Sequence, residues 1–487
     1  MAEIDYKEFF KGKKITLLGL GVLGRGVGDA KFLAECGAEL IVTDLKTREQ
    51  LVSSLSELAG FKNITFVLGE HRLEDFEHRD MVIKAAGVPL DSPYIAHAKK
   101  CSVPIEMSTA LFAKLSGATI VGITGTRGKT TTTHLIYEGL KKAVDAGWKG
   151  LHHPADRMVG QKICVPHIFL GGNIQGVSTL ALLPEVKAGD IVVLELDSWQ
   201  LQGFGPTSQN ELRGTSEAGI SPHISVFTNL MVDHMNYYKN DMEQYFRDKA
   251  NIFLYQKAGD VLVAGKAVAE KIKQQMPGDF PATIIEAPPM ALPLDWEITL
   301  VGAHNRENAT LAFLALKALG LSSGMIRSAF EKFTGVAGRL EFVREINGVK
   351  IYNDTTATTP DATVAGLRAL GEHERKNIVL IFGGADKGLD MSALISEIPK
   401  YCKVAVLLPG TGTEKIRFMI HDSRFMNMRV EEEKTLTEAV HTAMEQAEKG
   451  DIILFSPAFA SFGMFTNEYD RGEQFLKIVD SIGKCHL

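Results

Sequence analysis

Cysteine is scarce in this chain: there are five among 487 residues, widely separated and without a Cys-x-x-Cys pair. This spacing argues against a disulfide framework or a zinc ribbon and is typical of reduced thiols in a cytoplasmic protein. No apolar run approaches the roughly 20 residues of a membrane-spanning helix. The first ten residues, MAEIDYKEFF, have no apolar core and predict no secretory signal. We therefore expect a cytoplasmic protein without a membrane partner.

The chain also lacks a strong excess of either charge. Its 53 lysines and arginines stand against 59 aspartates and glutamates, and no basic block dominates. This balance argues against nucleic acid as the main partner. With 45% apolar and 23% charged residues, the composition is that of an ordinary globular protein. A chain of this length is expected to form about three domains of roughly 150 residues each.

A strand, a glycine-rich turn and a helix are predicted in sequence around TGTRGKTTTT. Gly125 and Gly128 let backbone N–H groups turn toward phosphate oxygens. Lys129 places an ammonium at the β- and γ-phosphates of a nucleotide, and Thr130 offers a hydroxyl to Mg²⁺ at the helix N-terminus. Five residues separate Gly122 from Gly128, where the usual motif has four. The sequence therefore predicts a variant P-loop.

A second glycine motif lies near the N-terminus. Gly19, Gly21 and Gly24 form GxGxxG after an apolar run, and the next apolar run ends at Asp44. This arrangement is typical of a Rossmann unit, in which the acid contacts a ribose. On its own it is a weak signal. It leaves open whether the glycines bind a nucleotide or only allow a helix to pack closely on a strand.

Two predicted strands after the P-loop end in polar residues. DIVVLE ends in Glu195, and Asp197 follows two positions later, so on a continuous strand both carboxylates share one face. This placement is typical of a Mg²⁺ ligand. The run ISVFTNL leads to His234, and Lys249 stands in the next helical stretch. Taken alone, a single histidine or lysine of this kind is more often structural or solvated.

The patterns predict an α/β protein of three domains. Residues 1–115 are expected to form a Rossmann-like domain, residues 116–334 a P-loop ATPase domain with a mainly parallel sheet, and residues 335–487 a Rossmann-like α/β domain. The third domain is predicted to open with a hairpin on an Asn-Gly turn. The adjacent His152 and His153 lie in a polar stretch, which favours a solvated loop over a metal site.

Taken in order, a set of short motifs resembles the Mur ligase family: TGTRGKTTTT, GGN, LELDSWQL, TNLMVDHM, GAHNRENA, GRLE, YNDTTAT and LFSPAFASFGMFTNEYDRG. The resemblance covers essentially the whole chain and is greatest to the members that add glutamate to UDP-N-acetylmuramoyl-L-alanine. It implies an ATP- and Mg²⁺-dependent amide ligase of peptidoglycan precursor synthesis that works through an acyl phosphate. UDP-N-acetylmuramoyl-L-alanine and glutamate are the implied substrates, and a monomer is expected.

The resemblance also implies roles for single residues. The implied catalytic residues are Lys129, Glu195, His234 and Lys249. The implied metal ligands are Thr130, Glu195, His234 and Lys249, the last as a carbamate that helps to hold a second Mg²⁺ ion. The implied ATP-binding residues are Gly125, Thr126, Gly128, Lys129, Thr130, Thr131, Asn305, Arg339 and Asp354. The UDP substrate is expected to contact Val22, Leu23, Asp44, Asn173 and His234, and glutamate is expected to contact Thr358, Lys387 and Ser461.

The chain departs from the family pattern at several positions. Thr356 stands where a lysine is usual, and Glu468 stands where an aromatic residue is usual. Both lie near the expected glutamate pocket, where an added carboxylate repels a dicarboxylate substrate. L-glutamate therefore stays an alternative to D-glutamate. Other departures are Asp197 and Trp199 in place of serine and phenylalanine, and Gly338 in place of a histidine.

Three further interpretations stay open. A folylpoly-γ-glutamate synthetase shares the P-loop and the lysine but lacks a Rossmann-like first domain. An NAD-dependent oxidoreductase fused to an ATPase would follow from GxGxxG and Asp44, but it leaves His234 and Lys249 unexplained. A catalytically silent nucleotide-binding protein is disfavoured by the intact Lys129 and Glu195.

Overall fold

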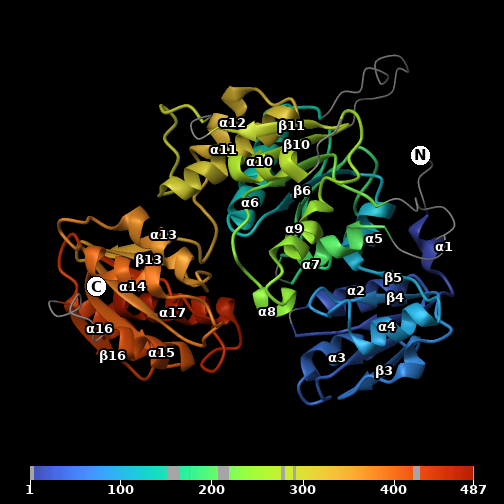
Figure 1. The fold of residues 1–487 in the computed structure, drawn as a ribbon, viewed down its shortest axis with the longest axis horizontal. Coiled ribbons are helices and arrows are strands. Elements are labelled where there is room, and N and C mark those ends of the chain that lie inside the picture. Colours follow the sequence, from blue (N-terminus) through green and yellow to red (C-terminus); the bar gives the residue numbers. More distant parts are fainter. Residues whose placement is uncertain are drawn as a thin grey trace. The chain divides into compact units, whose positions relative to one another are not determined.

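The computed structural model describes the following parts of the chain: residues 5–22, 24–150, 165–174, 176–206, 219–275, 280–288, 292–420 and 428–485. The strands form three sheets, in agreement with the predicted three-domain α/β fold (Figure 1). Contacts within the chain divide it into two units. Unit 1 comprises Met1–Trp296 with Asn308–Glu331, and unit 2 comprises Glu297–Glu307 with Lys332–Leu487. Unit 1 holds the first two sheets, and the exact domain boundaries stay predictions.

The first sheet has five parallel strands in the order β3-β2-β1-β4-β5. Its strands are β1 (Lys14–Leu18), β2 (Glu39–Asp44), β3 (Ile64–Leu68), β4 (Met81–Lys84) and β5 (Ile105–Glu106). The helices are α1 (Tyr6–Phe10), α2 (Arg25–Glu35), α3 (Val52–Leu58), η1 (Leu73–Phe76), α4 (Pro93–Lys100) and α5 (Ser108–Leu115). The strand order reverses between β1 and β4, which opens a crevice at their carboxyl ends.

The second sheet has six parallel strands in the order β11-β10-β9-β6-β8-β7. Its strands are β6 (Thr119–Thr124), β7 (Ile168–Gly172), β8 (Ile191–Glu195), β9 (Ile224–Phe227), β10 (Val261–Gly265) and β11 (Thr283–Ala287). The helical elements are α6 (Lys129–Asp145), η3 (Leu180–Leu182), α7 (Ser198–Leu201), η4 (Gln202–Phe204), α8 (Met235–Tyr238), α9 (Met242–Ala250), α10 (Lys266–Gln275), α11 (Ala303–Ala318) and α12 (Ser323–Phe330). Because β6 lies between β8 and β9, the P-loop that follows β6 is flanked by the ends of both strands.

The third sheet, in unit 2, has the order β12-β13-β17-β14-β15-β16 and is parallel except for β12. Its strands are β12 (Glu341–Ile346), β13 (Val349–Asn353), β14 (Ile378–Gly383), β15 (Cys402–Leu408), β16 (Arg429–Glu432) and β17 (Ile452–Phe455). The helices are α13 (Pro360–Leu370), α14 (Ser392–Tyr401), α15 (Thr411–Ile420), α16 (Leu436–Gln446) and α17 (Glu468–Cys485). Asn347 and Gly348 both have positive φ, which allows the tight turn of the predicted β12–β13 hairpin.

Helices cover both faces of the third sheet, which explains its apolar strands. One core cluster packs Val364 of α13 and Leu394 of α14 on the sheet, and another packs Leu436 of α16 and Phe475 of α17 on it. Strand β14 is accordingly buried at every position, as is typical of a parallel strand covered on both faces. None of the helices in the described ranges is long and apolar enough to cross a bilayer.

Candidate active site

The P-loop conformation at the end of β6 requires glycine at two positions. Gly125 has φ +142° and Gly128 has φ +82°, values that side chains with a Cβ rarely adopt. A Cβ on Gly125 would lie 1.9 Å from Thr228 Oγ1, and one on Gly128 would lie 2.1 Å from Asn308 Oδ1. The loop is therefore enclosed by residues that follow β9 on one side and by α11 on the other.

The segment after β9 holds the P-loop in place. Asn229 accepts a hydrogen bond from the Arg127 backbone N–H at its Oδ1 (2.8 Å) and one from the Thr126 N–H at its carbonyl oxygen (2.9 Å). The Arg127 side chain donates to Asp233 Oδ2 at 2.7 Å. Burial alone would raise the pKa of Asp233, but the charges of Arg127 and His234 lower it to about 2. An ionised aspartate therefore anchors the loop through its arginine.

The first turn of α6 presents the predicted nucleotide-binding groups. Lys129 Nζ lies 3.1 Å from the Gly125 carbonyl oxygen and 3.2 Å from that of Thr126. Thr130 is partly exposed beside it, whereas Thr131 is buried. The N-cap of this helix is a glycine without a side-chain cap. The N–H groups of its first turn, together with the helix dipole, are suited to bind an anion.

Lys249 of α9 lies beneath the P-loop. Its Nζ donates to the Gly125 carbonyl oxygen at 2.8 Å and stands 4.8 Å from the centre of the Tyr245 ring. The side chain is 1% exposed. Burial first, and then the charge of Lys129, hold the pKa of Lys249 well below its usual value. This environment favours the neutral amine, which is the form that reacts as a nucleophile.

Glu195 occupies the last position of β8, opposite Ile123 of β6. It is 4% exposed, and its Oε2 has no hydrogen-bond partner among the described residues. An unpaired buried carboxylate oxygen is costly unless a cation binds it. Carboxylate and hydroxyl oxygens are also the donors that Mg²⁺ prefers. Glu195, with Thr130 in the first turn of α6, thus fits a Mg²⁺ ion.

The prediction that Glu195 and Asp197 share a strand face is wrong. Strand β8 ends at Glu195, and Asp197 is the N-cap of α7. Its Oδ1 accepts from the Gln200 backbone N–H at 2.7 Å, and Gln200 Oε1 accepts from the Asp197 N–H at 3.2 Å. This reciprocal cap satisfies N–H groups that a helix start leaves unpaired, so Asp197 begins a helix instead of continuing the strand.

His234 lies at the start of α8 with a left-handed backbone, φ +56°. Its ring centre is 4.7 Å from that of Trp199, and its Nε2 lies 3.6 Å from Asp233 Oδ2. Burial lowers the pKa of His234, the charge of Asp233 raises it, and the charge of Lys129 lowers it again. The structure therefore brings His234 together with the P-loop lysine and with Lys249.

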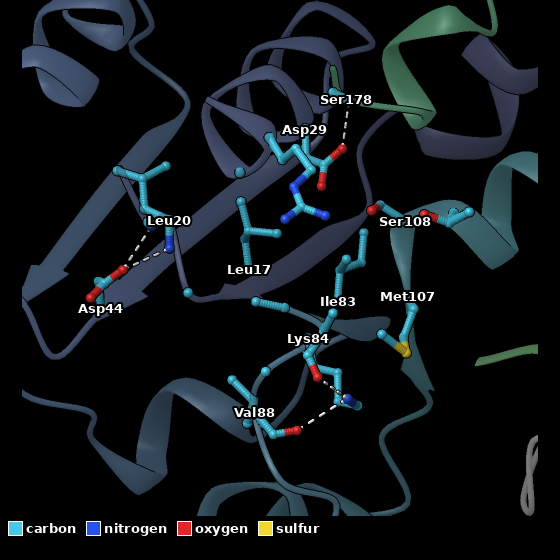
Figure 2. Close-up of a pocket in the computed structure, with 18 of the residues that line it drawn as sticks. Leu17, Leu20, Asp29, Asp44, Ile83, Lys84, Val88, Met107, Ser108 and Ser178 are labelled. Atoms are coloured by element: carbon cyan, nitrogen blue, oxygen red, sulfur yellow. Dashed lines mark hydrogen bonds between the residues drawn. The ribbon is translucent and has the colours of Figure 1, made fainter. Parts of the chain in front are cut away.

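A cavity of about 460 Å³ opens at the carboxyl ends of β1 and β4, where the first sheet reverses its strand order (Figure 2). It is also lined by residues of the second domain, among them Ser178 and Gln200. Val22 lies in its wall and is 47% exposed. Leu23, predicted beside it, lies outside the described residues.

Asp44 lines this cavity, but its carboxylate already binds the glycine turn. Its Oδ2 accepts from the N–H groups of Leu20 and Gly21 at 2.9 Å each, and its Oδ1 accepts from that of Lys46 at 2.9 Å (Figure 2). The observed role of Asp44 is thus to fix the turn after β1.

Lys84 is a cavity residue that sequence reasoning missed. It is 2% exposed at the end of β4, and its Nζ donates to the carbonyl oxygens of Val88 (3.1 Å) and Ala86 (3.4 Å) (Figure 2). Burial lowers its pKa to about 8. Its only sequence signal is a charge at the end of an apolar run.

Asn173 links the cavity to the strand that carries Glu195. Its backbone N–H donates to the Glu195 carbonyl oxygen at 2.7 Å, and its Oδ1 accepts from Arg25 Nη1 at 2.8 Å. Arg25 in turn lines the cavity. The predicted substrate residue and the predicted metal ligand are therefore neighbours.

Unit 2 contains two pairs of predicted site residues. Thr358 and Lys387 are predicted to bind glutamate, and Arg339 and Asp354 are predicted to bind ATP. Lys387 Nζ donates to Thr358 Oγ1 at 2.9 Å. Ser461 is buried and directly follows Ala460, which forms an antiparallel β-bridge with Ala385. Burial raises the pKa of Asp354 to about 7, while hydrogen bonds from Ser456 and the Leu340 N–H, and the charge of Arg339, lower it.

Asn305 is buried in the first turn of α11, where its Nδ2 donates to the Val301 carbonyl oxygen at 2.9 Å. The asparagine of this helix that meets the P-loop glycine is Asn308, about one turn further on. Both asparagines lie on the helix that the sequence pattern indicated, and the ATP-binding role of Asn305 stays a prediction.

The fold and this site define a P-loop protein of three α/β domains. Three family profiles match the chain in order: "Mur ligase MurD-like, N-terminal domain" at residues 13–106, "Mur ligase middle domain" at 123–285 and "Mur ligase, glutamate ligase domain" at 338–459. The chain belongs to the Mur ligase family.

Relatives match over nearly the full length of the chain. The UDP-N-acetylmuramoylalanine--D-glutamate ligase of Roseiflexus sp. is 36% identical, over 96% of this chain and 99% of its own. The enzyme of the same name from Borreliella afzelii is 33% identical, over 97% and 99%. Among solved structures, MurC of Thermotoga maritima has a TM-score of 0.59 at 19% identity, over 96% and 99% of the two chains. MurF of the same organism, in complex with ADP, has a TM-score of 0.55 at 14% identity, over 99% and 100%.

Proposed function

We propose that this protein joins D-glutamate to UDP-N-acetylmuramoyl-L-alanine in an ATP-dependent step of peptidoglycan precursor synthesis. The observation that carries the proposal is the 36% identity, over almost the whole of both chains, with a relative named for this reaction. The proposed location is the cytoplasm and the proposed state is a monomer.

The reaction needs two steps. The carboxylate of the alanine residue attacks the γ-phosphorus of ATP, which releases ADP and forms an acyl phosphate. The glutamate amine then attacks the acyl carbon and phosphate leaves. Both steps bring anions together, so positive charge and fixed N–H donors must surround the transferred phosphoryl group. Lys129 and the N-terminus of α6 are the groups that we assign to this task.

Mg²⁺ is part of the proposal, with Glu195 and Thr130 as ligands and His234 beside them. When bound, Mg²⁺ supplies charge neutralisation between phosphate oxygens. Lys249 is proposed to be carbamylated. Its lowered pKa favours the neutral amine that reacts with CO₂, and the neighbouring charges of Lys129 and Arg127 would stabilise the anionic product.

The cavity between the first two sheets is the proposed site for the UDP part of the substrate. It lies at a topological switch point, where α/β sheets bind nucleotides. Arg25 and Lys84 supply positive charge in its wall for a diphosphate. Asn173 then connects this site to Glu195, where the substrate carboxylate must react.

Thr358, Lys387 and Ser461 are the proposed glutamate-binding residues. Glu468, the carboxylate that departs from the family pattern, acts on a cation: its charge raises the pKa of Arg471, which burial lowers. Arg471 is 1% exposed. We propose that the charge of this buried cation reduces the repulsion that Glu468 would exert on a dicarboxylate. L-glutamate is the second candidate, because Thr356 and Glu468 both depart from the pattern of D-glutamate ligases.

The direct test is product analysis. The protein is incubated with ATP, Mg²⁺, UDP-N-acetylmuramoyl-L-alanine and D-glutamate, and the nucleotide products are identified by mass spectrometry. A product heavier than the substrate by one glutamyl residue is expected. Its absence, with folded protein and all reactants present, would overturn the proposal.

A further inference from the structure

Three side chains of different metal-ligating types meet in the first domain, apart from the residues that line the nucleotide cavity. His97 and Cys101 stand four positions apart on α4 and its C-cap, and Glu77 follows η1. His97 Nε2 lies 2.8 Å from Glu77 Oε1 and 3.7 Å from Cys101 Sγ. All three ligand atoms lie within 4.8 Å of one another.

The distance between the histidine nitrogen and the cysteine sulfur matches that between two ligands of a tetrahedral cation. For zinc, bond lengths of about 2.0 Å to nitrogen and 2.3 Å to sulfur place the two ligands about 3.5 Å apart. The observed His97–Cys101 separation is 3.7 Å. The Glu77 oxygen needs to move outward by only about half an ångström to reach a comparable position, and its side chain is 39% exposed.

We propose that Glu77, His97 and Cys101 form a binding site for a borderline-soft divalent cation of the zinc class, with water as the fourth ligand. The donor set selects this class, because thiolate and imidazole favour zinc over Mg²⁺. The thiolate and the carboxylate balance the charge of the cation. The site also lies at the C-terminal end of α4, where the helix dipole favours positive charge. This inference does not depend on the proposed function.

The site joins the two ends of a chain segment that lines the cavity of the first domain. The segment between Glu77 and His97 contains β4 and the cavity residues Lys84 to Val88. A cation that joins the two ends of this segment closes a loop of the chain and restricts its motion. The cysteine spacing gave no signal for the site, because its ligands come from a helix and from a loop about 20 residues earlier.

Cobalt spectroscopy tests the proposal with the full chain. Co²⁺ is titrated into wild-type protein, Cys101→Ser and the matched control Cys485→Ser, which changes the same residue type elsewhere. Wild type and the control should show a thiolate-to-cobalt charge-transfer band and tetrahedral visible bands, which Zn²⁺ then displaces. Cys101→Ser should lose the charge-transfer band, and a band that survives there would overturn the proposal.

Zinc affinity gives an independent measure through competition with a chromophoric chelator. Cys101→Ser and His97→Ala should each weaken Zn²⁺ binding by more than the about 10- to 100-fold typical of changes outside the ligand set. Glu77→Gln should weaken it less, because an amide oxygen can still coordinate. Equal zinc affinity in wild type, Cys101→Ser and His97→Ala would show that zinc binds elsewhere and would overturn the proposed site.

Discussion

Lys249 Nζ lies 2.8 Å from the Gly125 carbonyl oxygen, although the two residues are 124 positions apart in the chain. The hydrogen bond places a buried amine directly beneath the P-loop, within the electrostatic influence of Lys129. It makes α9 part of the structure that supports the P-loop.

Replacing Lys249 should remove activity and leave the fold intact. We expect Lys249→Ala and Lys249→Met to lower the rate of phosphate release by at least about 100-fold, without rescue by added bicarbonate. Lys257→Ala, at an exposed position, is the control. Near-normal turnover in a Lys249 variant would remove the carbamate from the mechanism. In wild type, ¹³C-bicarbonate should give a carbamate carbonyl resonance that both variants lack.

Glu195→Gln should lower activity without lowering the stability of the fold. The substitution keeps the shape of the side chain but removes the negative charge that we propose as a Mg²⁺ ligand, so kcat/KM should fall by at least about 100-fold. Because one oxygen of the buried carboxylate has no hydrogen-bond partner in the described parts of the chain, the variant's melting temperature without Mg²⁺ should equal or exceed that of wild type. The exposed Glu270→Gln should change neither quantity. A variant as active as wild type would exclude Glu195 as a ligand.

Because of Asp29, the free energy of unfolding should decrease as the pH rises from about 4 to 7. Burial raises its pKa from 3.8 to about 6, against hydrogen bonds from Ser178 and Ser108. The folded state therefore holds a proton that the unfolded state has lost, and this contribution disappears as pH rises through the folded pKa. Asp29→Asn should gain unfolding free energy over wild type with rising pH, up to about 3 kcal/mol above pH 7.

Chemical denaturation at several pH values checks this gain. Asp145→Asn, at an exposed position, should show no such pH-dependent difference from wild type. A constant difference between Asp29→Asn and wild type across the range would contradict the account.

Lys84 should make binding of the UDP substrate weaker at high pH. Its pKa is lowered by burial to about 8, so its positive charge is present below that pH and lost above it. The Lys84→Met variant should bind the UDP substrate about 10- to 100-fold more weakly at pH 7. Its affinity should also vary less between pH 7 and 9. Calorimetry with Lys62→Met as control tests both points. Unchanged affinity would place the diphosphate away from Lys84.

Much of the fold follows from local patterns. The apolar strands, the two glycine motifs and the Asn347–Gly348 turn are set by residues close in sequence. Strands β11 and β16 lie at the edges of their sheets, and β16 is mostly charged. Asp197 was misjudged because a strand end and a helix cap both favour an acid. The roles of Asn229 and Asn308 depend on which segments the topology brings to the P-loop.

The central claim is best tested by phosphate release from ATP in the presence of UDP-N-acetylmuramoyl-L-alanine and either D- or L-glutamate. The account predicts release with D-glutamate alone, which would make Glu468 and Thr356 tolerated departures. Release with L-glutamate alone would contradict the proposed stereochemistry and favour the second candidate. Release with neither amino acid would contradict the proposed reaction itself.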